Sequence, residues 1–339
     1  MNRHQIRNDI NEVQPLSLHH IIGQKQVTDV LRVHVDAHFK IRATKQDGTS
    51  SFGPVALLGP TGTGKTLVAN VIHAELGNLR WCQTNGQALN QINVLSSLLL
   101  NADEHTTIFI DEAHGLNSKV QDTLLTAISE RYLPVPDSQY VIPLNPFALI
   151  IATTDEYRLQ EPFRGRMRIR CRFRLYTVPE LVGILRQRAD TLGWKYEPEQ
   201  VFQMIASRAK GTARIALNFL QTCWEVSQNN DRKRIMVSDV REAFFLLQVD
   251  SLGLEDIDRD YLRVLSQRNY TALNVISSHL SVPPKTIQDS IEPYLIREHL
   301  ITKNSNSLRG LTQKGEQHLK TTDQSHSAEG TTDGNFNIQ

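Results

Sequence analysis

Cysteine and long apolar runs are both scarce in this sequence of 339 residues. Its 3 cysteines (Cys82, Cys171 and Cys223) have none of the short spacings of metal sites, and an odd number cannot pair completely. Such usage is typical of a reducing compartment. The longest apolar run, residues 147–152, is too short to span a bilayer, and the first residues lack the apolar core of a signal peptide. The sequence therefore predicts a cytoplasmic protein.

An excess of charge of either sign is also absent. The sequence has 37 Lys and Arg against 36 Asp and Glu, a formal net charge of +1. This balance creates no overall field that would predict a nucleic-acid or membrane partner by itself. The length predicts two or three domains with substantial cores.

A glycine-rich loop at residues 59–66 has the complete pattern G-x-x-x-x-G-K-T. The apolar residues 55–58 before it are typical of a buried strand, and residues 67–76 after it are apolar at helical spacing. In that context, backbone N–H groups surround phosphate oxygens at the positive end of a helix dipole. We predict a nucleoside triphosphate site, with Lys65 on the β- and γ-phosphates and Thr66 on Mg²⁺. The binding residues assigned here are Gly59, Thr61, Gly62, Thr63, Gly64, Lys65, Thr66 and Leu67.

Two carboxylates follow a second apolar strand at residues 107–110. At the end of that strand, Asp111 is expected to hold Mg²⁺ through water, and Glu112 to orient and polarise the attacking water. The run Asp-Glu-Ala-His ends in His114 and matches the name of the DEAH-box helicases, but no recombinase-like second domain follows. We interpret His114 as a local structural side chain.

Three further polar residues are candidates for the same chemistry. Thr154 follows the apolar run 147–152, where a strand tip can touch the γ-phosphate. Arg166, or its rival Arg164, can reach the nucleotide of a neighbouring subunit as an arginine finger does in trans. Arg214 stands near the start of a helix, where a cation opposes the helix dipole, so it is either kept for an anion or is a plain surface arginine.

Taken in this order, the motifs resemble those of AAA+ ATPases and, among them, the RuvB family of Holliday-junction branch-migration motors. The most specific segments are residues 109–117, 152–154, 211–216, 253–259 and 292–296, of which generic AAA+ motors lack the last two. The resemblance implies that Thr154 is sensor 1, Arg166 the finger and Arg214 sensor 2. It also implies an adenine pocket built by Ile21, Ile22 and Tyr176.

What the resemblance implies for function is an ATP- and Mg²⁺-dependent DNA motor, assembled as a hexameric ring, that drives branch migration in recombination and repair. Four departures from the family pattern stand beside it: Gln14 replaces an arginine, Ala213 a proline and Ser129 a glutamate. The fourth is residues 132–144, which are shorter than the family's RuvA-docking hairpin and contain three prolines. Whether a RuvA-like partner is used stays open.

The expected fold class is α/β, an AAA+ P-loop NTPase whose parallel sheet has helices on both faces, followed by a helical lid and a C-terminal winged helix. The boundaries predicted are 1–177 for the ATP-binding domain, 178–250 for the lid, 251–318 for the winged helix and 319–339 for a disordered tail. Winged helices bind DNA or dock proteins. For DNA phosphates the candidates are Lys303, Arg309 and Lys314.

Arginine alternates with other residues from Arg164 to Arg174. If the segment is a strand, this pattern places six arginines on one face. These arginines either contact a neighbouring subunit's phosphates or DNA, or form a charged, solvated edge of the sheet. Two other functions remain for the whole chain. One is a AAA+ loader or remodeller that acts on a protein, and the other is a DNA-binding regulator that ATP switches.

Overall fold

The computed structural model describes residues 9–44, 51–135, 139–197 and 200–329. Of these, the residues up to Lys195 together with Gly211–Gln221 form one compact unit. Tyr196–Lys210 and the residues from Thr222 onward form a second. Within the described ranges, no helix is long and apolar enough to cross a membrane. The domain boundaries expected at residues 177, 250 and 318 stay a prediction.

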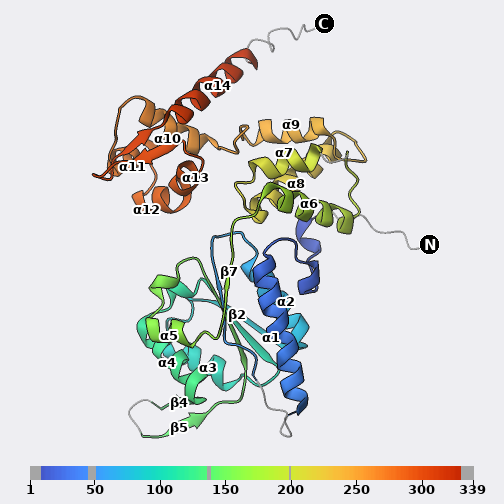
Figure 1. The fold of residues 1–339 in the computed structure, drawn as a ribbon, viewed down its shortest axis with the longest axis vertical. Coiled ribbons are helices and arrows are strands. Elements are labelled where there is room, and N and C mark those ends of the chain that lie inside the picture. Colours follow the sequence, from blue (N-terminus) through green and yellow to red (C-terminus); the bar gives the residue numbers. More distant parts are fainter. Residues whose placement is uncertain (1–8, 45–50, 136–138, 198–199, 330–339) are drawn as a thin grey trace, which may run out of the picture. The chain divides into compact units, whose positions relative to one another are not determined.

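The first unit is built on a five-stranded sheet in the order β2-β3-β6-β1-β7 (Figure 1), with every neighbouring pair parallel. In this register Leu58 of β1 lies opposite Thr153 of β6, and Asp111 ends β3 at the same edge of the sheet. The carboxyl ends of parallel strands are where such sheets bind ligands. The strands are β1 (Val55–Leu58), β2 (Arg80–Asn85), β3 (Thr106–Asp111), β6 (Ala148–Thr153) and β7 (Ile169–Arg172).

Helices cover both faces of this sheet, because alternate strand residues point to opposite sides. On one face Leu57 packs with Leu31 of α1 (Lys25–Thr44) and Ile72 of α2 (Lys65–Leu76). On the other, Leu58 packs with Leu124 and the helices α3 (Ile92–Leu100), α4 (Ser118–Glu130) and α5 (Glu161–Arg166). The α/β fold with helices on both faces is confirmed.

A short hairpin projects from this unit after α4. Its strands β4 (Tyr132–Pro134) and β5 (Val141–Pro143) pair antiparallel, with Leu133 opposite Ile142. Proline lacks the N–H that a ladder needs, so Pro134 and Pro143 stand at the ends of strands only three residues long. The third proline of this segment, Pro136, lies outside the described residues. The prolines of this segment therefore do not prevent a hairpin from forming.

The rest of the first unit consists of short helical segments and two longer helices. The 3₁₀ turns are η1 (Ile10–Glu12), η2 (Leu18–His20), η3 (Ala113–Gly115) and η4 (Glu156–Arg158). Helix α6 (Val178–Leu192) begins with a capping box between Thr177 and Glu180 and ends at Gly193, whose φ is +77°. Helix α8 (Ala213–Asn229) starts in this unit.

The second unit contains α7 (Gln200–Arg208), the remainder of α8, α9 (Val237–Leu246) and a C-terminal winged helix. The winged helix has one core, in which Tyr261, Ile276 and Leu295 are fully buried. Its wing is an antiparallel hairpin, which agrees with the winged helix predicted from the sequence. The elements are α10 (Asp256–Ser266), α11 (Leu273–Leu280), α12 (Pro284–Thr286), the π-turn η5 (Ile287–Ile291), α13 (Glu292–Arg297), β8 (Ile301–Lys303), β9 (Arg309–Leu311) and α14 (Gln313–Glu329).

Pro293 lies where the third helix of the winged helix changes its winding. A proline inside an α-helix removes one hydrogen bond and clashes with the preceding turn. The structure absorbs it with the π-turn that ends at Ile291, in which the N–H of Glu292 donates to the carbonyl of Ile287. The helix is therefore not ended by Pro293 but widens by one turn just before it.

Two expectations from the sequence are wrong in part. Arg164 and Arg166 lie on helix α5, so the strand face of six arginines does not exist. The alternation of exposed and buried residues holds only from Arg168 to Arg174. The tail predicted to be disordered from residue 319 continues as helix α14 to Glu329, and residues 330–339 lie outside the described part.

Candidate nucleotide-binding site

The glycine-rich loop connects β1 to α2 and depends on glycine where the backbone takes positive φ. Gly62 and Gly64 have φ of +73° and +95°. Gly62 is also constrained by packing, since a Cβ added there would lie 2.4 Å from Cγ2 of Thr212. The first residue of α2 is Lys65, so the loop ends at a helix N-terminus as predicted.

Lys65 is almost fully buried and directs its ammonium into the loop. Its Nζ donates to the carbonyls of Gly59 and Pro60, both at 2.8 Å. Burial lowers the pKa of Lys65, while the nearby carboxylates of Glu112 and Asp111 act in the opposite direction. A desolvated cation of this kind is matched by phosphate oxygens, which supply the negative charge that two carbonyls lack.

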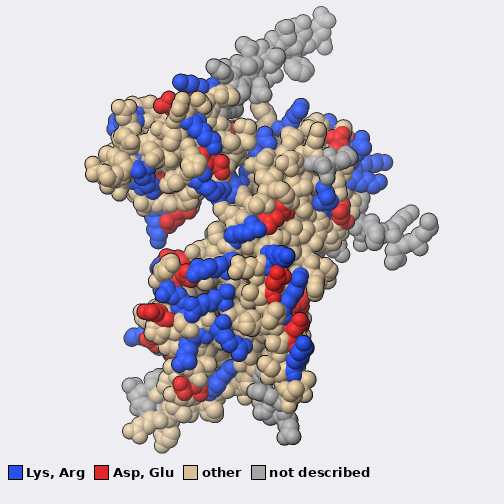
Figure 2. All heavy atoms as spheres, in the orientation of Figure 1, with Lys and Arg blue, Asp and Glu red and all other residues tan. Residues whose placement is uncertain are grey.

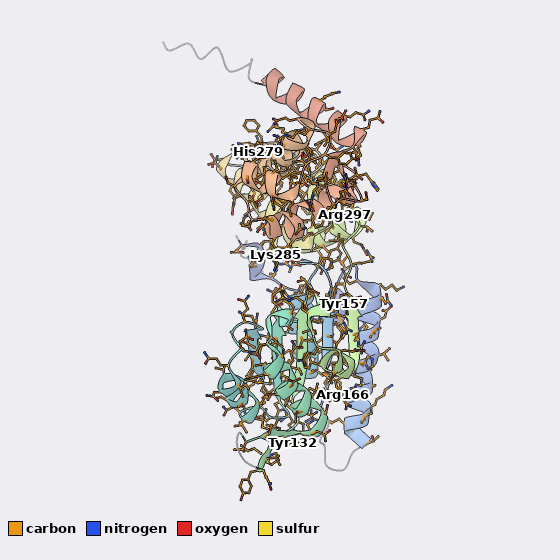
Figure 3. The ribbon with its side chains drawn as sticks, turned by 90° about the vertical axis from the view of Figure 1, so that its left-hand side faces the viewer. Tyr132, Tyr157, Arg166, His279, Lys285 and Arg297 are labelled. Carbon is orange, nitrogen blue, oxygen red and sulfur yellow. The ribbon has the colours of Figure 1, made fainter. Side chains whose placement is uncertain are left out.

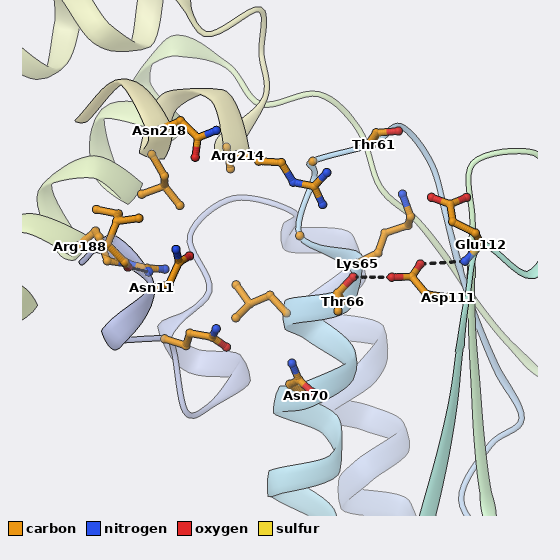
Figure 4. A pocket seen from close by; sticks show the side chains of 17 residues that line it. Asn11, Thr61, Lys65, Thr66, Asn70, Asp111, Glu112, Arg188, Arg214 and Asn218 are labelled. Carbon is orange, nitrogen blue, oxygen red and sulfur yellow. Dashed lines mark hydrogen bonds between the residues drawn. The ribbon is translucent and has the colours of Figure 1, made fainter. Parts of the chain in front are cut away.

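The carboxylates at the end of β3 lie beside this loop (Figure 4). Oγ1 of Thr66 donates to Oδ2 of Asp111 at 3.0 Å, and the backbone N–H of Glu112 donates to Oδ1 of Asp111 at 2.9 Å. Glu112 itself adopts a φ of +45°, which is rare for a residue with a side chain. Thr66, Asp111 and Glu112 are therefore brought together as the sequence predicted.

The tip of β6 adds hydroxyl groups to the same place. Oγ1 of Thr154 lies 3.5 Å from Oε2 of Glu112. Nδ1 of His114 lies 3.1 Å from that same oxygen and 3.2 Å from Oγ1 of Thr153. Thr154 thus contacts the predicted base, although its side chain does not line the cavity described next.

Arg214 enters the site from the start of α8 (Figure 4). Its backbone N–H lies 3.3 Å from the carbonyl of Gly62, so the helix start is fastened to the glycine-rich loop. The side chain lies on the cavity side of the loop, where its charge further lowers the pKa of Lys65. Two cations that approach one point without a phosphate between them repel each other, and this arrangement suits a polyanionic ligand.

These groups line one end of a cavity of about 280 Å³. Its other end is polar, and sequence reasoning missed it. Two of its residues carry a signal that could have been used, since Asn70 and Asn218 each stand one helical turn after a residue assigned to the site. The remainder come from distant segments. The full set at that end is Ile10, Asn11, Gln14, Asn70, Arg188, Leu217 and Asn218.

None of the three residues that the resemblance implies for the adenine pocket, Ile21, Ile22 and Tyr176, lines this cavity, and their role there stays a prediction. Tyr176 is buried beneath the loop, where its hydroxyl donates to the carbonyl of Thr63 at 2.8 Å. Ile21 packs against the core that α1 and α2 share, and Ile22 faces Gly183 of α6. Thr63 is also buried, and its hydroxyl donates to the carbonyl of Pro60 at 2.8 Å.

The arginine-finger candidates lie elsewhere on the first unit, on helix α5, as a residue that acts in trans requires. The guanidinium of Arg164 lies over the ring of Tyr157, 5.4 Å from its centroid. Arg166 is exposed, and its side chain forms no hydrogen bond or ion pair with the described residues. Figure 3 shows Arg166 and Tyr157 on one face of this unit.

Basic side chains gather around α5 and β7 on the surface (Figure 2). Not all are available to a partner. Arg172 forms an ion pair with Glu156 at 2.6 Å, and Arg174 pairs with Glu180 at 2.5 Å. Arg168 is exposed, and its charge helps to lower the pKa of His34 on α1, after the effect of burial.

The three DNA candidates of the winged helix differ in exposure. Arg309 is 4% exposed, and its Nε donates to Oε1 of Glu292 at 2.7 Å, so it stabilises the wing and offers no charge to phosphate. Lys303 is partly exposed and pairs with the same carboxylate. Lys314 is half exposed, with its Nζ 2.7 Å from the carbonyl of Glu298. The prediction for Arg309 is contradicted by its burial.

The fold and these contacts define a P-loop ATPase of the AAA+ class. The glycine-rich loop, the two carboxylates at the end of β3 and Arg214 line one cavity at the edge of a parallel sheet, and the hydroxyl of Thr154 lies beside Glu112. Oxygen ligands from Thr66 and Asp111 suit Mg²⁺.

Three family models match nearly the whole chain. They are the Holliday junction DNA helicase RuvB P-loop domain at residues 13–173, the RuvB AAA lid domain at 176–250 and the RuvB C-terminal winged helix domain at 251–320. The chain belongs to the RuvB family.

Relatives and solved structures agree with this assignment. The Holliday junction branch migration complex subunit RuvB of Wolbachia sp. subsp. Brugia malayi (strain TRS) is 32% identical over 314 residues, which cover 91% of this chain and 93% of the relative. That of Kosmotoga olearia is 30% identical over 317 residues, with 91% and 90% covered. The Thermotoga maritima RuvB Holliday junction branch migration motor superposes with a TM-score of 0.78 at 30% identity, covering 91% and 98%.

Proposed function

We propose that this chain is the subunit of a ring-forming motor, the hexamer that the resemblance implies, that couples ATP hydrolysis to branch migration of four-way DNA junctions in recombination and repair. One observation carries the proposal. A complete hydrolytic arrangement around Lys65, Asp111 and Glu112 occurs in a chain that RuvB models match from the P-loop to the winged helix. A degenerate, non-hydrolysing relative would be expected to lose one of these groups.

Mg²⁺ is the metal we assign to this site. Thr66 supplies a hydroxyl and Asp111 a carboxylate, and their oxygens are 3.0 Å apart, which fits a hard cation that takes oxygen ligands. When bound, Mg²⁺ neutralises charge that develops on the phosphates. Thr66 and Asp111 orient it, and Lys65 holds the β- and γ-phosphates.

Hydrolysis then depends on three further side chains. Glu112 orients and polarises the attacking water, and Thr154, in contact with Oε2 of Glu112, reports on the γ-phosphate. Arg214 balances phosphate charge within the same subunit. Arg166 completes the site of a neighbour, because its own cavity does not include it and its guanidinium has no partner in the described part of the chain. A finger in trans requires a neighbouring subunit in a head-to-tail contact, and such contacts form a ring when the rotation between subunits closes.

DNA binding is assigned to the winged helix. Its net charge is low, so phosphate contacts depend on where individual cations lie. Lys314 and Lys303 are the partly exposed candidates, and Arg309 supports the wing from inside. Salt sensitivity of DNA binding should accordingly be modest.

The hairpin of β4 and β5 is the segment that we expect to bind a RuvA-like partner. The curated relatives are named as subunits of a complex. The hairpin exposes three apolar side chains in a row, Tyr140, Val141 and Ile142, at 79%, 52% and 39%. Apolar residues exposed side by side on a projecting segment are typical of a protein contact.

The same hairpin supports a second candidate function. With Arg309 buried and apolar residues exposed on β5, a AAA+ machine that remodels a protein remains consistent with the surface. The ATP-switched DNA-binding regulator is less well supported, because no catalytic group is missing.

Steady-state ATP hydrolysis, alone and with linear duplex or a synthetic four-way junction, separates these functions. The proposal predicts stimulation by the junction and loss of hydrolysis in Glu112→Gln. Brisk hydrolysis that ignores DNA would favour the protein remodeller. Turnover far below about one per second without stimulation, against the 1–100 per second usual for phosphoryl transfer, would favour the regulator.

A further inference from the structure

His114 lies between the proposed catalytic base and the tip of β6, and neither the fold nor the nucleotide site requires a histidine there. It belongs to the 3₁₀ turn η3, directly after the strained residue Glu112. Its side chain is 23% exposed and does not line the cavity. It therefore acts on the nucleotide, if at all, through another residue.

The hydrogen-bond pattern fixes which group of His114 is used. The hydroxyl of Thr153 donates to the carbonyl of Asp155 at 3.2 Å and accepts from the N–H of Asp155 at 3.1 Å. A threonine hydroxyl has only one proton, so Thr153 can only accept from His114. Glu112 as a carboxylate can also only accept. Nδ1 of His114 then carries a hydrogen that it donates to Oγ1 of Thr153 at 3.2 Å, and the same nitrogen lies 3.1 Å from Oε2 of Glu112.

This shared donor matters because Glu112 has few other restraints. Its side chain is 46% exposed, and within the described residues its carboxylate accepts one hydrogen bond, from the hydroxyl of Thr154 at 3.5 Å, the limit for such a bond. A glutamate without tethers samples several rotamers, whereas a base must hold its oxygen within a fraction of an ångström of the reacting water.

We propose that His114 is a positioning residue for ATP hydrolysis: its Nδ1–H ties Oε2 of Glu112 to Thr153 and leaves Oε1 for the attacking water. The tether joins two strands of the sheet, since Glu112 follows β3 and Thr153 ends β6. Thr154, the residue that reports on the γ-phosphate, is bonded directly to Thr153. If the tip of β6 moves, His114 therefore transmits the movement from Thr153 to the carboxylate of Glu112. The inference rests on the proposed role of Glu112 in hydrolysis.

Substitutions of His114 that keep or move the donor test this role. In His114→Asn the amide nitrogen occupies the place of Nδ1, whereas in His114→Gln it reaches the place of Nε2. We expect His114→Ala and His114→Gln to lower kcat about tenfold to a hundredfold, with KM and the affinity for a fluorescent ADP analogue unchanged. His114→Asn should retain most of the activity. A matched control is His105→Ala, which removes another histidine paired with a glutamate, Glu104, on the surface of the same unit.

The coupling to β6 is tested by a double-mutant cycle with Thr153→Val, which keeps the shape of this buried residue. If His114 acts through both acceptors, the losses in kcat from His114→Ala and Thr153→Val are not additive. Fully additive losses in kcat would contradict the proposed role of His114. So would a His114→Asn variant as slow as His114→Ala, or a His114→Ala variant in which only KM changes. If Glu112→Gln hydrolyses ATP at the wild-type rate, the proposed function is wrong. If Glu112→Gln is inactive and His114→Ala is unaffected, only the inference about His114 is wrong.

Discussion

At the scale of single residues, the phosphate end of the site was predictable and the opposite end was not. Lys65, Thr66, Asp111 and Glu112 belong to short motifs whose spacing is set by a strand, a turn and a helix, and the structure brings them together. The far end of the cavity is assembled from residues that are distant in sequence, such as Asn11 and Arg188, and no local pattern marks them. Tyr176 lies outside that cavity with its hydroxyl on the carbonyl of Thr63, and its part in an adenine pocket stays a prediction.

The choice between the two finger candidates is a prediction at this scale. Arg164 is engaged with Tyr157 in its own chain, whereas Arg166 is not engaged within the described residues. We expect Arg166→Ala to lower kcat about a thousandfold or more while nucleotide binding is preserved, because a finger acts on charge that develops in the transition state.

The matched variant Arg164→Ala should stay within about threefold of the wild type, as a surface cation–π contact contributes little. Turnover numbers and the binding of a fluorescent ATP analogue check both variants. If Arg164→Ala is inactive and Arg166→Ala is not, the finger is Arg164.

At the scale of elements, the helices and strands with clear periodicity were predicted, and the errors fall where a short segment fits two periods. The alternating arginines fit a strand, yet Glu161-Pro162 begins a helix that contains Arg164 and Arg166. Proline in the first turn is a helix-start signal that the alternation concealed. The wing was placed correctly as a hairpin, but its arginine was not. Burial of Arg309 depends on Glu292, which is 17 residues away and belongs to another element.

The buried carboxylate of Glu292 holds the wing to the helices. It accepts from Arg309 at 2.7 Å, Lys303 at 2.5 Å and Tyr261 at 3.0 Å. Burial alone would raise the pKa of Glu292, but these hydrogen bonds outweigh burial and hold the pKa below its usual range. Glu292→Gln leaves Arg309 buried without its counter-charge, and we expect the free energy of unfolding of the winged helix to fall by about 3 kcal/mol.

Hydrogen exchange of the winged-helix amides in the full chain measures this loss, with the exposed Glu316→Gln as control. Because the pKa of Glu292 is lower in the folded state, its carboxylate stabilises the winged helix fully at pH values above the unfolded-state pKa of about 4.3. This stabilisation is lost as the pH falls through the folded-state pKa. Protection in the wild type should therefore decline below about pH 4.3, and Glu292→Gln should lack that component. Equal protection in Glu292→Gln and the wild type at neutral pH would contradict this account.

At the scale of the whole molecule, the account requires subunits that complete one another's sites. Arg166→Ala keeps Glu112 in its own site, and Glu112→Gln keeps a finger for its neighbour. Each variant alone should be inactive, but a mixture should regain hydrolysis. In a randomly mixed ring at equal amounts, about a quarter of the sites combine an intact base with an intact neighbouring finger.

The recovered rate is measured as the two purified variants are mixed in varying ratio at constant total protein. A maximum near equal amounts is expected. Mixtures that stay inactive at every ratio, under conditions where the wild type hydrolyses ATP, would show that Arg166 does not act in trans.

The most direct test of the motor itself is the conversion of a labelled, synthetic four-way junction into its duplex products by the purified chain, with and without a RuvA-like partner. The account predicts conversion that requires ATP and Mg²⁺ and is lost in Glu112→Gln, although that variant still binds nucleotide. A junction that stays intact while the wild-type chain hydrolyses ATP at full rate, with the partner present, would contradict the assignment of this chain as a branch-migration motor.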